Sequence, residues 1–225
     1  FCPNRAVSDA LAIREYYRQE YNSETTFIAY GAEMGKLTTR AALDDLGLQP
    51  EGYFLYVSRM EPENNALLVR EAFEQVATDL RLALIGDAPY SADYIEQVRQ
   101  TRDPRIVIPG AIYGQGYKEL GSFCYAYIHA TEVGGTHPAL IEAMGRGALV
   151  LYLDTEENRE VAGGVGLPFT AASLPEVLRQ TLALPEAERE RLRAAAVSRV
   201  QERYSWDAVT DAYVALFEEL CTDRG

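Results

Sequence analysis

YAYIHATEVGGTHPALIEAMGRGALVLYLD, residues 125–154, contains two short apolar runs joined by a glycine-rich turn and a helical segment. The runs at 125–129 and 149–153 carry the large apolar side chains that a buried strand needs. Between them, Gly134 and Gly135 allow a tight turn that residues with a Cβ would strain. The stretch therefore predicts a strand, a glycine turn, a short helix and a second strand.

The helix of this stretch is predicted to begin at Pro138, because proline lacks the N–H that a first helical residue leaves unpaired. Thr136 or His137 is placed to cap the helix, and Gly147 to end it. A helix that opens after a strand and a double glycine presents unpaired N–H groups to an anion. Glu142, one turn in, lies close enough to reach a sugar hydroxyl beside that anion. A turn packed for structural reasons alone fits the same pattern, and the stretch by itself leaves both interpretations open.

Strands and helices alternate from residue 53 onwards. Apolar runs predict further strands at 53–57, 81–85 and 105–108, and amphipathic segments predict helices at 64–77, 91–101 and 116–122. This alternation predicts an α/β fold, a doubly wound parallel sheet (Rossmann-like) that binds ligands at the carboxyl ends of its strands. The loops at that edge are 58–65, 86–90, 109–116, 131–138 and 155–159. A helical tail is predicted at 174–182, 186–203 and 206–220, and the charged run 187–196 is most simply a solvated helix face.

The chain is predicted to divide into four parts. The first carries a helix, capped by Ser8 or Asp9, and a strand at 25–30. The second is a polar connector with a short helix at 39–46. The third is the sheet domain and the fourth a final helix. Their boundaries are 1–34, 35–50, 51–203 and 204–225.

Composition narrows the class of protein. With 225 residues, of which 48% are hydrophobic, the chain can bury a substantial core. A formal net charge of -13 argues against nucleic acid or an anionic membrane surface as a partner. Three cysteines at scattered spacings fit no disulfide framework and no zinc pattern, which favours the cytoplasm. The chain begins without Met and without a signal-peptide pattern, so we expect it to be part of a longer protein.

Arg59 directly follows the predicted strand at 53–57, where a guanidinium can hold a diphosphate through paired hydrogen bonds. A surface ion pair with Glu61 or Glu63 is the alternative, which position alone favours. Gly110 begins a flexible loop after the predicted strand at 105–108. The backbone of such a loop can hydrogen-bond the edge of a nucleobase, although an ordinary strand-to-helix connection is the more frequent case.

His129 and His137 are the two histidines of the chain. A lone histidine at the end of a strand is more often a structural group than a base or ligand. Without a cysteine or carboxylate at ligand spacing, the pair predicts no metal site. The sequence also lacks a nucleophile elbow, a phosphate-binding lysine loop and a dinucleotide fingerprint.

Five motifs, YFLYVSRMEPENN, IGDAPY, RIVIPGAIYG, GGTHPALIEAM and GVGLPF, follow one another in a familiar order and spacing. Together they resemble the C-terminal, donor-binding half of retaining glycosyltransferases of family 4, which have the GT-B fold. The resemblance covers about residues 5–220, and EPENN with VGGTHPALIEAM is most similar to the bacterial rhamnosyltransferase-like subgroup. RYSWDAVTDAYVALFEEL looks like the family's closing helix, and residues 1–34 look like a remnant of its N-terminal acceptor domain.

The resemblance implies roles for individual residues. Arg59 would contact the donor diphosphate, and Asn64 stands where the family has a second cation, a lysine. Glu142 matches the second glutamate of a paired motif and would bind the donor ribose, whereas Gly134 replaces the first glutamate and Glu132 lies two residues too early. Gly135, Thr136 and His137 match the turn residues whose N–H groups meet the phosphates. Gly110 matches the last residue of the segment that contacts the nucleobase.

The function implied by the resemblance is hexosyl transfer in polysaccharide biosynthesis. The donor would be a UDP- or dTDP-sugar, with dTDP-rhamnose as one candidate, and the acceptor a glycan or lipid-linked glycan. Arg59 and Glu142 would be the catalytic residues, and no metal or other cofactor is expected. The protein is expected in the cytoplasm. Peripheral contact with the inner membrane is expected through the N-terminal acceptor domain, of which residues 1–34 would be a remnant. The donor-binding half alone is expected to be inactive.

Two other classes of function remain. A non-catalytic nucleotide-sugar-binding or scaffold module would explain the loss of the lysine and of the first glutamate. A sugar-nucleotide epimerase of the same architecture would need carboxylates and a histidine in its cleft, for which the chain offers Glu142 and His129. We also expect the helices that contain Tyr16 and residues 206–220 to keep apolar faces, which favour self-association.

Overall fold

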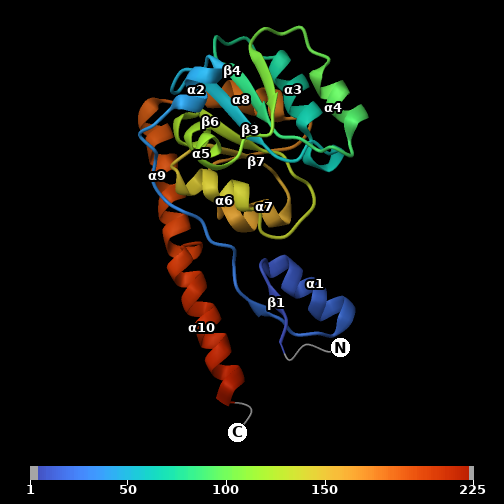
Figure 1. Ribbon diagram of the computed structural model, residues 1–225, viewed down its shortest axis with the longest axis vertical. Helices are drawn as coiled ribbons and strands as arrows, with labels where there is room; N and C mark the ends of the chain where they lie inside the picture. The colour runs from blue at the N-terminus through green and yellow to red at the C-terminus, as the bar shows by residue number, and fades with distance from the viewer. Residues whose placement is uncertain (1–4, 223–225) are drawn as a thin grey trace.

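A six-stranded parallel sheet forms the centre of residues 5–222, the part of the chain that the computed structural model describes (Figure 1). Its order is β5-β4-β3-β6-β7-β8, and every neighbouring pair is parallel. The strands are β3 Tyr53–Val57, β4 Arg81–Ile85, β5 Ile106–Gly110, β6 Ala126–His129, β7 Val150–Leu153 and β8 Leu167–Phe169. The chain reverses its direction of progress between β3 and β6, which is where doubly wound sheets bind ligands. The predicted fold class is confirmed.

Helices cover both faces of the sheet because its strands are apolar on both sides. In β3, Phe54 and Tyr56 face one layer of helices, and Tyr53 and Leu55 face the other; none is more than 1% exposed. The first layer is α3 Ala66–Glu74, α4 Ala92–Arg99 and α8 Leu174–Ala183. The second is α2 Ala41–Leu46, α5 Gly114–Phe123, α6 Pro138–Gly145, α7 Glu156–Ala162 and α9 Glu186–Arg203. No helix of the described residues is long and apolar enough to cross a membrane.

The sequence missed two elements after β7. Residues 155–159, expected as a loop, begin α7, whose first turn is capped by Thr155 Oγ1 accepting from the N–H of Asn158 at 3.2 Å. The edge strand β8 escaped prediction because it is short and contains Pro168, which a strand tolerates only at an edge.

The charged run 187–196 is not wholly a solvated face. Arg193 of α9 is buried, and its guanidinium donates to the carbonyl oxygen of Tyr125 at 2.8 Å and to the carboxylate of Glu51. Its neighbours Ala196 and Leu192 pack against the two layers of the core. The arginine therefore attaches α9 to the start of β6, a role that the charge pattern concealed.

A small lobe lies below the sheet (Figure 1). It consists of β1 Val7–Ser8, α1 Leu11–Tyr21 and β2 Thr26–Phe27, and its two strands pair in parallel. The strand expected at 25–30 is thus only two residues long. The last helix, α10 Trp206–Thr222, extends down from α9 towards this lobe, and Ile28 packs there against Val209 and Leu216.

The start of α1 is held by a residue far away in the sequence. The prediction that Ser8 or Asp9 caps this helix is wrong: Ala10 is at the N-cap position and no side chain of the lobe caps it. Instead, the N–H of Leu11 donates to the two carboxylate oxygens of Glu160 in α7, at 2.9 and 3.0 Å. A carboxylate at a helix N-terminus also complements the helix dipole. The contact joins the small lobe to the sheet domain.

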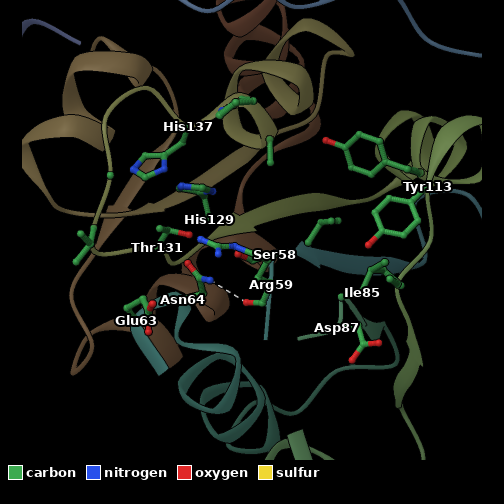
Figure 2. Close-up of a pocket in the computed structure, with 18 of the residues that line it drawn as sticks. Ser58, Arg59, Glu63, Asn64, Ile85, Asp87, Tyr113, His129, Thr131 and His137 are labelled. Atoms are coloured by element: carbon green, nitrogen blue, oxygen red, sulfur yellow. Dashed lines mark hydrogen bonds between the residues drawn. The ribbon is translucent and has the colours of Figure 1, made fainter. Parts of the chain in front are cut away.

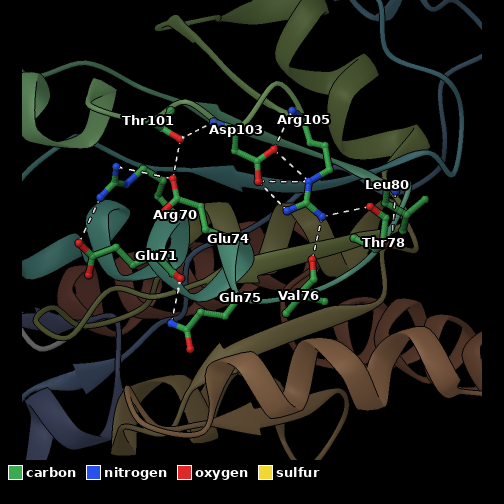
Figure 3. Close-up of polar contacts among 10 residues, drawn as sticks. All are labelled: Arg70, Glu71, Glu74, Gln75, Val76, Thr78, Leu80, Thr101, Asp103 and Arg105. Carbon is green, nitrogen blue, oxygen red and sulfur yellow. Dashed lines mark hydrogen bonds and ion pairs between the residues drawn. The ribbon is translucent and has the colours of Figure 1, made fainter.

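Arg105 anchors the edge strand β5 (Figure 3). Its guanidinium pairs with Asp103 and donates to the carbonyl oxygens of Val76 and Thr78, at 2.7 and 3.0 Å. These carbonyls follow α3, so one side chain closes the end of a helix and fixes the strand beside it. The loop that leaves β5 at the opposite end enters the candidate site.

Candidate functional site

A cavity of about 590 Å³ opens at the carboxyl ends of the strands, above the point between β3 and β6. It is lined by the loops that follow β3, β4, β5 and β6 and by the beginning of α6. In Figure 2, His129, His137 and Thr131 lie on one side of the cavity and Ile85, Asp87 and Tyr113 on the other. Four of the five loops that the sequence places at this edge therefore meet around one cavity.

The glycine turn before α6 forms one wall. Gly134 has a φ of +151°, and a Cβ there would lie 2.8 Å from the ring of His137. His137 occupies the N-cap position of α6 and Pro138 its first turn, as predicted, although the His137 side chain makes no capping hydrogen bond. Thr136 does not cap the helix either, because its hydroxyl donates to the carbonyl oxygen of Asp9. Within residues 5–222, no hydrogen bond involves the backbone N–H groups of Gly135, Thr136 and His137.

Arg59 and Asn64 lie together on the β3 side of the cavity. Arg59 is the one arginine or lysine among the described lining residues; its guanidinium is 3.2 Å from the Glu61 carboxylate and donates to the Tyr90 hydroxyl at 3.3 Å. The ion pair expected as the alternative role of Arg59 therefore exists at the mouth of the cavity. Asn64 is buried and its amide donates to the carbonyl oxygen of Arg59 at 2.8 Å (Figure 2). Asn64 thus supports the backbone of the loop that carries the cation.

His129 and His137 are brought together, with ring centroids 4.8 Å apart. Burial, and then the neighbouring His137, lowers the pKa of His129 to about 3. Burial also lowers the pKa of His137, against the smaller opposing effects of the Glu157 and Asp9 carboxylates. Both rings are therefore neutral near pH 7. Neither Nε2 atom has a hydrogen-bond partner among the described residues, so neither histidine is a fully hydrogen-bonded structural group.

Three residues singled out in the sequence do not line the cavity. Gly110, expected in the loop, is instead the last residue of β5; its φ is +96°, and the lining residues of the β5 loop follow it. Glu142 adjoins the lining residue Tyr117, whose hydroxyl donates to its Oε2 at 2.6 Å. Glu132 points elsewhere, accepting a hydrogen bond from the side-chain amide of Asn65 at 3.0 Å.

Several lining residues were not identified from the sequence, among them Asp87, Tyr117 and Thr131. Asp87 and Thr131 lie in loops that the sequence placed at the ligand-binding edge, so their position was a usable signal. Tyr117 lies on α5, and its place in the site depends on how α5 packs beside α6. Among residues 5–222, no group of three or more His, Cys, Asp or Glu side chains is arranged to hold a metal ion.

Residues 51–184 match the family model described as glycosyl transferases group 1. Sucrose-phosphate synthase from Thermosynechococcus elongatus superposes with a TM-score of 0.83 at 20% identity, over 99% of this chain and 59% of the other. A glycosyltransferase from Rickettsia africae gives 0.83 at 16% identity, over 96% and 63%. Anabaena HepE, solved in complex with UDP and glucose, gives 0.81 at 18% identity, over 96% and 62%.

These structures share the GT-B glycosyltransferase fold with this chain, which spans about three fifths of their length. No curated protein matches the sequence significantly.

Proposed function

The chain belongs to the glycosyl transferases group 1 family, and we propose that it binds the nucleotide-diphosphate sugar donor of a retaining hexosyltransferase. The observation that carries the proposal is one cavity, at the switch point of the sheet, that combines the Arg59 guanidinium with the free N–H groups before α6. A cation and a helix N-terminus are the groups that bind a diphosphate. The crystal structure of HepE with UDP and glucose supports a uridine nucleotide as the first ligand to test.

Arg59 and the N–H groups of the glycine turn would stabilise the leaving diphosphate. Breaking the bond between sugar and phosphate leaves negative charge on the nucleotide, and fixed donors aimed at that charge lower the barrier. Arg59 is mostly exposed at the mouth, so it can exchange its ion pair with Glu61 for the more strongly charged phosphates. Ala111 and Tyr113, which line the cavity after β5, would contact the base. Glu142, which adjoins the lining residue Tyr117, would bind the ribose.

The finer features of the proposal rest on the motifs of the sequence. EPENN and VGGTHPALIEAM favour the rhamnosyltransferase-like subgroup. The donor would therefore be either a UDP-sugar or a dTDP-sugar. We propose a glycan or lipid-linked acceptor held by residues outside this chain, so that this chain alone binds nucleotide without transferring sugar. Anomeric configuration would be retained, and no metal or other resident cofactor would take part. The scattered cysteines favour the cytoplasm, with peripheral membrane contact through the acceptor-binding part.

Calorimetric titration with UDP, dTDP and GDP tests the proposal. We expect one nucleotide to bind, and binding to weaken by about tenfold or more in Arg59→Gln and in Glu142→Ala, since a hydrogen bond to a charged group is worth about 1.5–3 kcal/mol. Glu132→Ala is the matched control, because this carboxylate belongs to the same motif but bonds Asn65 outside the cavity. Absence of binding by all three nucleotides, or equal binding by all variants, would overturn the proposal.

A non-catalytic nucleotide-sugar-binding module is the second candidate. It is favoured by the absence of a second cation: Asn64 stands in place of the lysine, and its side-chain amide donates to a backbone carbonyl oxygen. The transferase and the non-catalytic module are distinguished by measuring release of nucleoside diphosphate, using a protein that combines this chain with its acceptor-binding part. Turnover that depends on Arg59 and Glu142 supports the transferase. An epimerase is disfavoured because the low pKa of His129 makes it a poor proton carrier near neutral pH.

We further propose that the exposed apolar side chains of α1 and α10 make copies of this chain associate with one another. Tyr16, Tyr17 and Tyr21 of α1 are 52%, 42% and 63% exposed, and Phe217 of α10 is 57% exposed. The three tyrosine rings of α1 contact one another and form an exposed aromatic surface on the small lobe. Phe217 adds a second exposed aromatic site on α10, beside the ring of Tyr213. Sedimentation velocity over a range of concentrations should show association that replacing Tyr21 and Phe217 by serine abolishes; a strictly monomeric profile at high concentration would count against it.

A further inference from the structure

Tyr117 contacts the carboxylate that the proposed function assigns to the ribose. Tyr117 lies on α5 and Glu142 on α6, and the phenol hydroxyl donates to Glu142 Oε2 at 2.6 Å. Within residues 5–222, this is the one hydrogen bond that the Glu142 carboxylate accepts. Tyr117 itself lines the cavity, whereas Glu142 is not among the lining residues and is half-buried. The tyrosine therefore connects the cavity wall to the carboxylate.

The direction of this hydrogen bond is fixed. Burial, followed by the negative charge and hydrogen bond of Glu142, raises the pKa of Tyr117 far above its ordinary value. The phenol consequently stays protonated throughout the neutral range, and it can only donate to an ionised carboxylate. With Oε2 engaged, Oε1 is the carboxylate oxygen without a hydrogen-bond partner among residues 5–222, and it is not one of the fully buried unpartnered atoms.

Fixing a carboxylate before the ligand arrives has a thermodynamic consequence. A glutamate side chain loses rotamer freedom when it binds, and a hydrogen bond that already holds one conformer removes part of that loss. A short hydrogen bond between a neutral donor and a charged acceptor is strong enough to select one conformer.

We propose that Tyr117 is a positioning residue, whose hydroxyl holds Glu142 so that its free oxygen accepts a hydrogen bond from a ribose hydroxyl of the donor nucleotide. The inference rests on the proposed function, in which Glu142 binds the ribose. It goes further by assigning recognition of the ribose to a pair of helices, α5 and α6, in place of a single side chain.

The test is discrimination between a nucleotide and its deoxy analogues. UDP, 2′-deoxy-UDP and 3′-deoxy-UDP are titrated into the wild type and into Tyr117→Phe, with dTDP and its 3′-deoxy counterpart in parallel. The wild type should prefer the nucleotide that carries the hydroxyl bound by Glu142. Tyr117→Phe should lose about tenfold in affinity for that nucleotide and little for the analogue, so that the preference falls towards unity. In Glu142→Ala the preference should be absent, and adding Tyr117→Phe should change nothing more.

Tyr125→Phe is the matched control. Its buried hydroxyl donates to the carbonyl oxygen of Thr181 at 2.9 Å, away from the cavity, so its loss should lower the melting temperature without changing the preference. If Tyr117→Phe behaves like Tyr125→Phe, Tyr117 is only structural and the positioning role is wrong, while nucleotide binding and the proposed function stand. If GDP is the nucleotide that binds, GDP and its deoxy analogues take the place of UDP in the same comparison. If none of UDP, dTDP and GDP binds the wild type, the proposed function fails and the positioning role fails with it.

Discussion

Acidification should destabilise this fold through His129, a histidine that burial keeps uncharged. The residue is 3% exposed, and its ring lies 4.8 Å from that of His137 and stacks on Tyr127. Burial, and to a smaller extent His137, lowers the pKa of His129 from 6.5 to about 3. In the unfolded chain the same imidazole is hydrated and binds its proton near pH 6.5. The two states therefore differ in bound protons over a wide range of pH.

The size of the effect follows from the linkage between protonation and unfolding. A proton bound only by the unfolded chain favours unfolding, so the stability due to the neutral imidazole is complete above pH 6.5 and is lost as the pH falls towards 3. Within that window the slope approaches about 1.4 kcal/mol per pH unit. Between about pH 7.5 and about pH 5.5, His129 alone should lower the free energy of unfolding by about 1.4 kcal/mol.

Urea denaturation, followed by circular dichroism at both pH values, measures this loss. The comparison is between the wild type and His129→Gln, and the quantity of interest is the change in free energy of unfolding between the two pH values. Packing lost in the variant lowers its free energy of unfolding equally at the two pH values, so it cancels in the change between them. The acidic residues contribute the same change to both proteins, so they cancel in the comparison of the variant with the wild type. His129→Gln should lose about 1.4 kcal/mol less than the wild type on acidification.

His137→Gln is the companion variant. The pKa of His137 is also lowered by burial, but the Glu157 and Asp9 carboxylates oppose the shift. On acidification, His137→Gln should therefore differ from the wild type in lost free energy of unfolding by less than His129→Gln does. The reasoning is refuted if His129→Gln and the wild type lose the same free energy between the two pH values. Such a result would mean that the buried imidazole takes up its proton in the folded state.

Two further predictions concern the loops around the cavity. Gly86→Ala should lower the free energy of unfolding by about 3 kcal/mol or more and abolish nucleotide binding, because its Cβ would lie 1.8 Å from a backbone carbonyl oxygen and its φ is +154°. Gly35→Ala is the control for backbone strain, since its φ is +96° but nothing lies within 4 Å, and equal losses in both would contradict the steric argument. Asn158→Ala should cost about 2–4 kcal/mol in urea denaturation, because its buried amide donates to the carbonyl oxygens of Thr131 and Leu153 at 3.0 and 2.9 Å; a loss below about 1 kcal/mol would show that water replaces both bonds.

Much of the fold could be predicted from local pattern. The apolar runs at 53–57 and 81–85 coincide with β3 and β4, and α9 has the predicted bounds Glu186–Arg203. The strand–glycine–proline pattern also placed the start of α6 correctly. Periodicity succeeds here because a buried strand or an amphipathic helix shows its environment in its own side chains. It fails for β8, where three residues and a proline carry too little pattern.

The sequence by itself determined the parallel sheet, the edge formed by the carboxyl ends of its strands and the loops in which most of the cavity residues lie. The tertiary structure decided which side chains meet: Tyr117 with Glu142, His129 with His137, and Glu160 with the start of α1. The physical reason is range. Hydrophobic periodicity and capping patterns act within one element, whereas these contacts join elements whose relative position is set by the packing of helices on a twisted sheet, and no local pattern records that packing.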